Sequence, residues 1–139
     1  MAQAVREVMS SRPVTVKDSA TLVDAARAMR DANVGDVIVV KDDAICGVVT
    51  DRDLVVRAVA EGSDPKSVKV ADICSKDVTT VSPDEPIDNV VSLMRERAIR
   101  RVPVVEGGRP VGLVSLGDLA IEKDSKSALA DISAAKPNQ

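Results

Sequence analysis

The chain repeats itself without a gap, and this repeat constrains its fold more than any other feature. Shifting the sequence by 65 residues aligns Val5–Leu54 with Val70–Leu119. Thirteen of the fifty aligned positions are identical, and these are Val5, Ser10, Thr15, Val16, Met29, Arg30, Val37, Val39, Val40, Gly47, Val49, Asp53 and Leu54. Two copies of this length indicate a pseudo-two-fold pair, because solenoid repeats are shorter and more numerous.

Each copy predicts the same order of elements, β-α-β-β-α, after a short helical turn. The first copy predicts this turn, a strand, an amphipathic helix, a hairpin and a second helix at Val5–Met9, Val14–Val16, Thr21–Ala32, Val37–Val40 with Ile45–Val49, and Arg52–Ala60. The second copy predicts them at Val70–Cys74, Thr79–Val81, Pro86–Ala98, Val102–Val105 with Pro110–Val114, and Gly117–Glu122. Apolar strands need cover on both faces, and one copy has too little helix to provide it. The predicted fold is therefore α/β (α+β), with two tandem repeats packed in pseudo-two-fold symmetry.

The predicted boundaries follow from this repeat. Residues 1–60 form the first repeat, and residues 61–69 form a short polar linker that contains Gly and Pro. Residues 70–123 form the second repeat, and residues 124–139 form a C-terminal tail with a possible small helix at 127–135. The two repeats are expected to make one globular module.

The residue types that the chain lacks exclude several functions. Its 139 residues include no Phe, Tyr, Trp or His. Without His there is no His general base, His triad or His metal ligand, and the sequence predicts no metal site. Without aromatic side chains, bases of a single strand have no stacking platform. The net charge of −3 also argues against nucleic-acid binding.

Two cysteines stand alone in the sequence, Cys46 and Cys74. We expect both to be small buried apolar residues, since free cysteine is among the most buried residue types. A reducing compartment fits two unpaired cysteines, and no segment approaches the ~18 apolar residues of a membrane helix. The N-terminal segment lacks the apolar core of a signal peptide. The predicted location is cytoplasmic.

One eight-residue pattern ends both copies and is called the octet below. GVVTDRDL spans residues 47–54 and GLVSLGDL spans residues 112–119. A hydroxyl residue three positions before Asp at a helix start is a capping box, and Thr21 and Asp24 have the same spacing. The same corner could instead hold a sugar phosphate, because free N–H groups point outward there and an ionised carboxylate accepts from ribose hydroxyls. Gly47 and Gly112 would let a ligand or a backbone segment approach closely. The pattern alone leaves both interpretations open.

The duplicated unit resembles a cystathionine-β-synthase (CBS) domain, and the pair resembles a Bateman module. The resemblance covers about Val5–Ala60 and Val70–Lys123 and rests on PVTV (13–16), VTTV (78–81), RRVPVV (100–105), GVVTDRD and GLVSLGD. It implies an adenine-nucleotide site at each octet, with the hydroxyl at phosphate and the Asp at ribose. The residues concerned are Thr50 and Asp53 in one cleft, and Ser115 and Asp118 in the other.

The resemblance implies further contacts in each cleft. It places the base among residues of the first and middle strands, which are Thr15, Val37, Ile38, Thr80, Val102 and Pro103. It also implies that Arg100 and Arg101 reach phosphate, although they could equally be a solvated pair bonded to a nearby Asp. The matching residues of the first copy are Gly35 and Asp36, and Arg52 lies within the first octet. The two clefts are therefore expected to differ.

These expectations describe a regulatory module rather than an enzyme. The module would bind an adenosine-containing ligand (AMP, ADP, ATP, S-adenosylmethionine or NAD) in clefts between the repeats. It would act in trans on an unidentified protein target, without a further cofactor. The segment Arg52–Ala60 carries more apolar surface than one buried face needs, so we also expect a homodimer.

Three alternatives remain at this stage. The chain could be a ligand-free interaction or stress-response protein whose octets are only helix caps. It could be a phosphohydrolase in which Asp51 and Asp53 bind Mg²⁺, although no nucleophile–base pair accompanies them. RNA binding is disfavoured by the acidic net charge.

Overall fold

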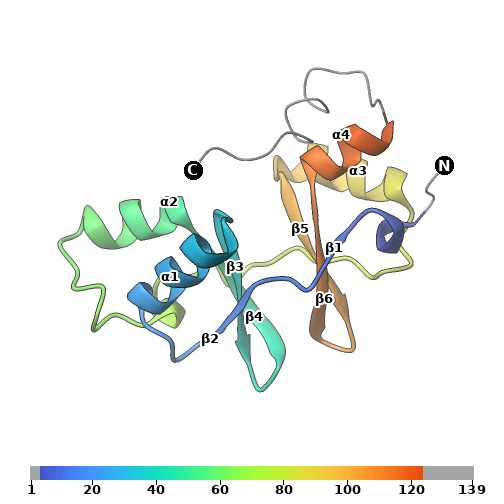
Figure 1. Ribbon diagram of the computed structural model, residues 1–139. Coiled ribbons are helices and arrows are strands. Elements are labelled where there is room, and N and C mark those ends of the chain that lie inside the picture. Colours follow the sequence, from blue (N-terminus) through green and yellow to red (C-terminus); the bar gives the residue numbers. More distant parts are fainter. Residues whose placement is uncertain (1–3, 124–139) are drawn as a thin grey trace. The chain divides into compact units, whose positions relative to one another are not determined.

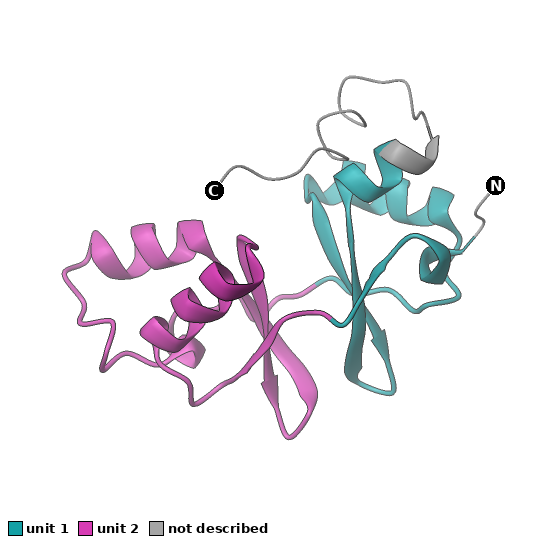
Figure 2. Ribbon diagram, viewed as in Figure 1, with its two compact units in different colours: residues 1–12, 79–139 teal, residues 13–78 magenta. Residues whose placement is uncertain are grey.

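A computed structural model describes residues 4–123, in two compact units. One unit consists of residues 13–78, and the other combines residues 4–12 with residues 79–123 (Figure 2). The repeat is visible in both, since each unit contains a small three-stranded sheet and its own helices (Figure 1). The mixed helix and strand content confirms the predicted fold class.

The unit of residues 13–78 is built on the sheet order β2-β3-β4, with bounds Thr15–Lys17, Asp36–Lys41 and Ala44–Thr50. Strand β2 is parallel to β3, and β3 is antiparallel to β4. Helix α1 (Leu22–Ala32) connects the parallel pair and buries Leu22, Ala25 and Met29 at the predicted helical spacing. The predicted helix at 52–60 begins as α2 (Asp51–Asp53) and continues as the π-helical segment η2 (Leu54–Val59).

The other unit has the sheet order β1-β6-β5, with bounds Ser10–Ser11, Arg109–Ser115 and Arg101–Glu106. Helices α3 (Ile87–Arg97) and α4 (Leu116–Lys123) belong to it. Helix α3 buries Ile87, Val90 and Met94, which match the buried positions of α1. Short 3-10 turns η1 (Val5–Glu7) and η3 (Val70–Asp72) open the two sequence repeats.

The compact units do not coincide with the sequence repeats, because the opening segments are exchanged. Strand β1 of the first repeat pairs with β6 of the second, with Ser10 opposite Leu113. In the other unit Ser75 of the second repeat pairs with Val48 of the first. These two pairings join matching residues of the repeat. Each unit therefore contains residues from both repeats.

The predicted strand at Thr79–Val81 is reduced to a single bridge between Val81 and Val104. In the first repeat the N–H of Ile38 donates to the carbonyl of Val14 at 2.9 Å. The matching residue is Pro103, which has no N–H to donate to Thr79. Two backbone hydrogen bonds remain. The N–H of Val81 donates to the carbonyl of Pro103, and the N–H of Val105 donates to the carbonyl of Val81.

Each unit has its own aliphatic core. In the unit of residues 13–78 the largest buried members include Leu22, Val37, Val39 and Val49, and Cys74 is buried among them. In the other unit Val5 and Leu119 join the buried faces of α3 and the sheet. Cys46 is half-buried and Cys74 buried, and both are free thiols. Their predicted role as small core residues is confirmed for Cys74.

Two further expectations concern helices. The predicted helix at 127–135 lies outside the described residues. Within residues 4–123, no helix is long and apolar enough to cross a membrane.

Candidate ligand-binding site

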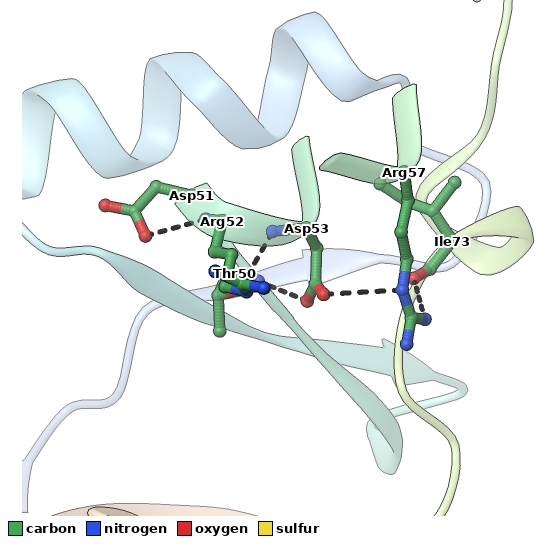
Figure 3. A network of polar contacts seen from close by, with 6 residues as sticks. All are labelled: Thr50, Asp51, Arg52, Asp53, Arg57 and Ile73. Atoms are coloured by element: carbon green, nitrogen blue, oxygen red, sulfur yellow. Dashed lines mark hydrogen bonds and ion pairs between the residues drawn. The ribbon is translucent and has the colours of Figure 1, made fainter. Parts of the chain in front are cut away.

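Each octet forms a corner at which the last strand of a hairpin enters a helix. The first corner is defined here as Thr50–Asp53, at the junction of β4 and α2. The N–H of Asp53 donates to Thr50 Oγ1 at 3.1 Å, and the N–H of Thr50 donates to Asp53 Oδ2 at 2.9 Å (Figure 3). This is a reciprocal capping box.

The second corner, Ser115–Asp118, repeats this geometry at the junction of β6 and α4. The N–H of Asp118 donates to Ser115 Oγ at 3.1 Å, and the N–H of Ser115 donates to Asp118 Oδ2 at 2.9 Å. The four capping side chains, Thr50, Asp53, Ser115 and Asp118, are half-buried rather than sealed in a core. The capping interpretation of the octets is therefore confirmed, and the corners remain accessible to solvent.

Capping leaves chemical capacity for a ligand at both corners. In a capping box the hydroxyl oxygen is an acceptor, so its own hydrogen is left to donate outward. The carboxylate has two oxygens with about four acceptor positions, and the backbone N–H takes one of them. A corner of this kind can therefore donate to a phosphate oxygen and accept from sugar hydroxyls while it caps the helix.

Arg57 contacts the first corner, and the sequence analysis did not identify it. Its Nε lies 3.6 Å from Asp53 Oδ1, and its Nη1 donates to the carbonyl of Ile73 at 3.0 Å (Figure 3). The guanidinium thus links the octet carboxylate to the chain after η3. The signal available in the sequence was the i, i+4 spacing of Asp53 and Arg57 on a predicted helix.

The predicted phosphate-contacting arginines lie at the edges of the corners. Arg101 begins β5 directly opposite Ser115 in the β5–β6 ladder. Arg100 precedes it, and its carbonyl accepts from the N–H of Leu116 at 2.7 Å. Both arginines are exposed, as is Arg52. The structure therefore brings Arg100 and Arg101 to the start of the helix that carries Asp118.

The six residues predicted to surround a base differ in their burial. Val37 and Val102 are fully buried members of the two aliphatic cores, so their side chains are already occupied by core packing. Ile38 and Pro103 follow them in the strands and point to the opposite face of each sheet, because side chains alternate along a strand, and both are buried as well. Thr15 and Thr80 are exposed, and Thr15 lies beside Ile38 in the β2–β3 ladder.

Asp51 and Asp53 are not arranged as a shared cation site. Figure 3 shows the Asp51 carboxylate turned away from that of Asp53. Asp51 Oδ1 accepts from the N–H of Arg52 at 2.8 Å, while Asp53 faces Thr50 and Arg57. Among residues 4–123, no three His, Cys, Asp or Glu side chains are grouped to hold a metal ion.

The two octet glycines, Gly47 and Gly112, lie directly against other parts of the chain. A Cβ on Gly47 would lie 2.7 Å from Cys74 Sγ and 2.8 Å from the carbonyl oxygen of Ser75. A Cβ on Gly112 would lie 2.5 Å from Met9 Sδ and 2.8 Å from the carbonyl oxygen of Ser10. The close approach predicted at these glycines is that of the exchanged opening segments.

Sequence comparisons give the repeats a family. A family model of the CBS domain matches residues 5–59 and 70–123. CBS domain-containing protein YhcV of Bacillus subtilis is 34% identical over 134 residues, which are 94% of this chain and 95% of that protein. Hypoxic response protein 1 of Mycobacterium tuberculosis is 33% identical over 116 residues, which are 83% of this chain and 81% of that protein.

Solved structures agree with the sequence comparisons. The structure of Hypoxic Response Protein I with two coordinated zinc ions has a TM-score of 0.77 at 31% identity, covering 84% of this chain and 96% of that one. The CBS domain pair of protein MJ0100, in complex with 5′-methylthioadenosine and S-adenosyl-L-methionine, has a TM-score of 0.79 at 26% identity, covering 89% and 98%.

Proposed function

This chain belongs to the CBS domain family, with two CBS repeats, and from that premise we propose that it is a regulatory module for an adenosine-containing ligand. The ligand class comprises adenine nucleotides, S-adenosylmethionine and related adenosyl compounds. The corners are the proposed contact points, with Thr50 and Ser115 donating to the ligand and Asp53 and Asp118 accepting from its ribose.

The observation that carries this proposal is the half-buried hydroxyl–carboxylate pair that recurs with nearly equal bond lengths at both corners. Such a pair keeps an outward hydroxyl hydrogen and spare carboxylate lone pairs. A structural relative supports the ligand class, since the CBS pair of MJ0100 is a complex with two adenosyl compounds. The zinc of Hypoxic Response Protein I is not carried over, because the described residues offer no grouped set of metal ligands.

The base of the ligand is proposed to lie against the exposed Thr15 and Thr80, since Ile38 and Pro103, like Val37 and Val102, are buried. With no aromatic side chain in the sequence, the base would be held by aliphatic contacts and backbone hydrogen bonds. Binding would alter the module's affinity for a protein target, so the proposed function is that of a sensor in trans and not of an enzyme.

The module is further proposed to be a homodimer. Val55, Val56 and Val59 of η2 are 58%, 45% and 66% exposed. Beside them is an apolar groove of about 420 Å³, lined by Leu22, Val23, Ala26, Arg27, Arg30, Leu54, Ala58, Val59, Ser63 and Pro65. An apolar helix face next to an apolar groove is the self-complementary surface that an isologous dimer needs.

A thermal-shift screen with AMP, ADP, ATP, S-adenosylmethionine and NAD tests the ligand class, read by dye because the chain has no Trp or Tyr. A ligand at one hundred times its Kd should stabilise the fold by about 2.7 kcal/mol. For a chain of this size the melting temperature should rise by about 5 °C. No shift with any of these compounds would contradict the proposal.

A ligand-free interaction protein is the second candidate, and the caps themselves favour it. Thr21 and Asp24 form the same box at 3.0 and 3.2 Å at the start of α1, where no ligand is proposed. If the corners are only caps, the variants Asp53→Ala and Asp118→Ala should change stability alone. The same screen distinguishes the two candidates, because this one predicts no melting shift with any adenosyl compound.

A further inference from the structure

The two carboxylate oxygens of Asp53 have different surroundings. Oδ2 accepts from the N–H of Thr50 at 2.9 Å in the capping box. Oδ1 faces Arg57 Nε at 3.6 Å, a distance that fits an ion pair but is too long for a hydrogen bond. The Asp53 side chain is 15% exposed, so it is not sealed from solvent. Oδ1 therefore keeps acceptor positions for a ribose hydroxyl while the guanidinium favours one orientation of the carboxylate.

The guanidinium of Arg57 is itself held by the chain that follows η3. Its Nη1 donates to the carbonyl of Ile73 at 3.0 Å, so Nε and Nη1 engage two different partners (Figure 3). Ile73 is 8% exposed and belongs to the aliphatic core of this unit. Two residues further on, Ser75 is hydrogen-bonded to Val48 of β4 at 3.0 and 3.1 Å. The partner that holds Arg57 is thus attached to the strand that leads into the first corner.

The helix that carries Arg57 differs from its counterpart at the second corner. After Asp53 the chain winds as the π-helical segment η2, whereas α4 is an α-helix. Segments of π-helix are rare and recur at functional sites. The residue that matches Arg57 in the second copy is Glu122, an acid. The sequence therefore offers Asp53 a cation four residues later and offers Asp118 none at the same spacing.

We propose that Arg57 is a positioning residue for ribose recognition at the first corner, an inference that rests on the proposed function. Arg57 acts through Asp53 and does not itself contact the ligand. It holds Asp53 Oδ1 in the direction from which the carboxylate accepts from the ribose hydroxyls, and Ile73 holds Arg57. The second corner recognises ribose without such a residue.

The Asp118→Ala protein, which keeps only the first corner intact, tests this role by titration calorimetry. The probes are adenosine and AMP, each compared with its 2′,3′-dideoxy counterpart, which lacks both ribose hydroxyls. This protein should bind each ribose compound about tenfold more tightly than its counterpart, which corresponds to about 1.4 kcal/mol. Adding Arg57→Gln should reduce this preference about threefold, the effect of a half-exposed ion pair, and should leave the affinity for the dideoxy compounds unchanged.

The ratio of affinities separates positioning from a purely structural role. If Arg57 only stabilised the helix through its i, i+4 ion pair, its loss would weaken ribose and dideoxy compounds by the same factor. Arg57→Lys keeps the charge but has one nitrogen for two partners, so it should give an intermediate preference. Arg6→Gln is the control, because Arg6 is also 52% exposed and is paired with an aspartate, Asp84, in the other unit. It should leave the preference unchanged.

Failure of this inference differs from failure of the proposed function. An Arg57→Gln protein that keeps the full ribose preference would overturn the inference and leave the adenosyl sensor standing. The same conclusion would follow if the Asp118→Ala protein showed no ribose preference, or bound none of the probes while the wild type did. No binding of any adenosyl compound by the wild type would overturn the inference together with the proposed function.

Discussion

Thr50 and Thr21 cap their helices in the same way, but only Thr50 is proposed to contact a ligand. Replacing a capping Thr or Ser by Ala costs about 1 kcal/mol of stability. We expect Thr21→Ala, Thr50→Ala and Ser115→Ala to lower the free energy of unfolding by similar amounts in urea denaturation. Thr50→Ala and Ser115→Ala should also weaken adenosyl binding, whereas Thr21→Ala should not. Equal binding by all three variants would assign the octets to capping alone.

The buried thiol of Cys74 predicts a dependence of stability on alkaline pH. Burial raises the pKa of this thiol above its ordinary value. A pKa raised on folding gives a contribution that is fully present at neutral pH and is lost as the pH rises through the folded-state pKa. Between neutral pH and about pH 10 the wild type should therefore lose more stability than Cys74→Ala. Denaturation of both proteins in reducing buffer measures this, and parallel curves would show that the thiol contributes nothing.

At the scale of elements, the close contact at Gly47 fixes where the exchanged segment crosses β4. Two backbone hydrogen bonds, at 3.0 and 3.1 Å, hold Ser75 against Val48, so the carbonyl of Ser75 cannot move away from a new Cβ. Gly47→Ala should therefore lower the free energy of unfolding by about 1–3 kcal/mol, the usual range for overpacking.

A second substitution separates the two contacts that a Cβ at position 47 would make, with Cys74 Sγ and with the carbonyl oxygen of Ser75. Adding Cys74→Ala to Gly47→Ala removes the Sγ contact but leaves the carbonyl contact, so it should restore only part of the packing. A Gly47→Ala protein with the stability of the wild type would show that the segment is not held there.

Much of this level of structure could be predicted from the sequence. The repeat, the helices at 22–32 and 87–97 and both hairpins follow from local periodicity, and they are confirmed. The exchange of opening segments could not be predicted, because periodicity does not identify a distant pairing partner. The predicted strand at Thr79–Val81 is reduced to a bridge, and the sequence did contain the reason. Pro103 stands at the position that matches Ile38 and has no N–H to donate.

The two corners were also predicted only in part from the sequence. The spacing of Thr50 and Asp53 predicted a helix start with a capping box, which is confirmed. The pairing of Asp36 and Arg101 with the corner hydroxyls depended on strand register, which the sequence left unspecified. Val37 and Val102 were placed at the base by the family resemblance, and the sequence did not show that their side of each strand packs into the core.

At the scale of the whole molecule, the exposed valines of η2 predict self-association. In sedimentation equilibrium the wild type should behave as a dimer. Val59→Asp and Val55→Asp should shift it toward the 14.6 kDa monomer, since a charge in an apolar interface is costly to desolvate. Val34→Asp is the control, because Val34 is also exposed, at 37%, but lies outside η2 and the groove. A wild type that is monomeric at all concentrations would remove the dimer from the account.

The central claim is that the octet carboxylates bind an adenosyl ligand in addition to capping their helices. Titration calorimetry with AMP and with S-adenosylmethionine tests it most directly, comparing wild type, the Asp53→Ala/Asp118→Ala double variant and Asp24→Ala. The account predicts that wild type and Asp24→Ala bind with the same affinity, and that the double variant loses at least about tenfold, or 1.4 kcal/mol. A folded double variant that binds both compounds like the wild type would contradict the account.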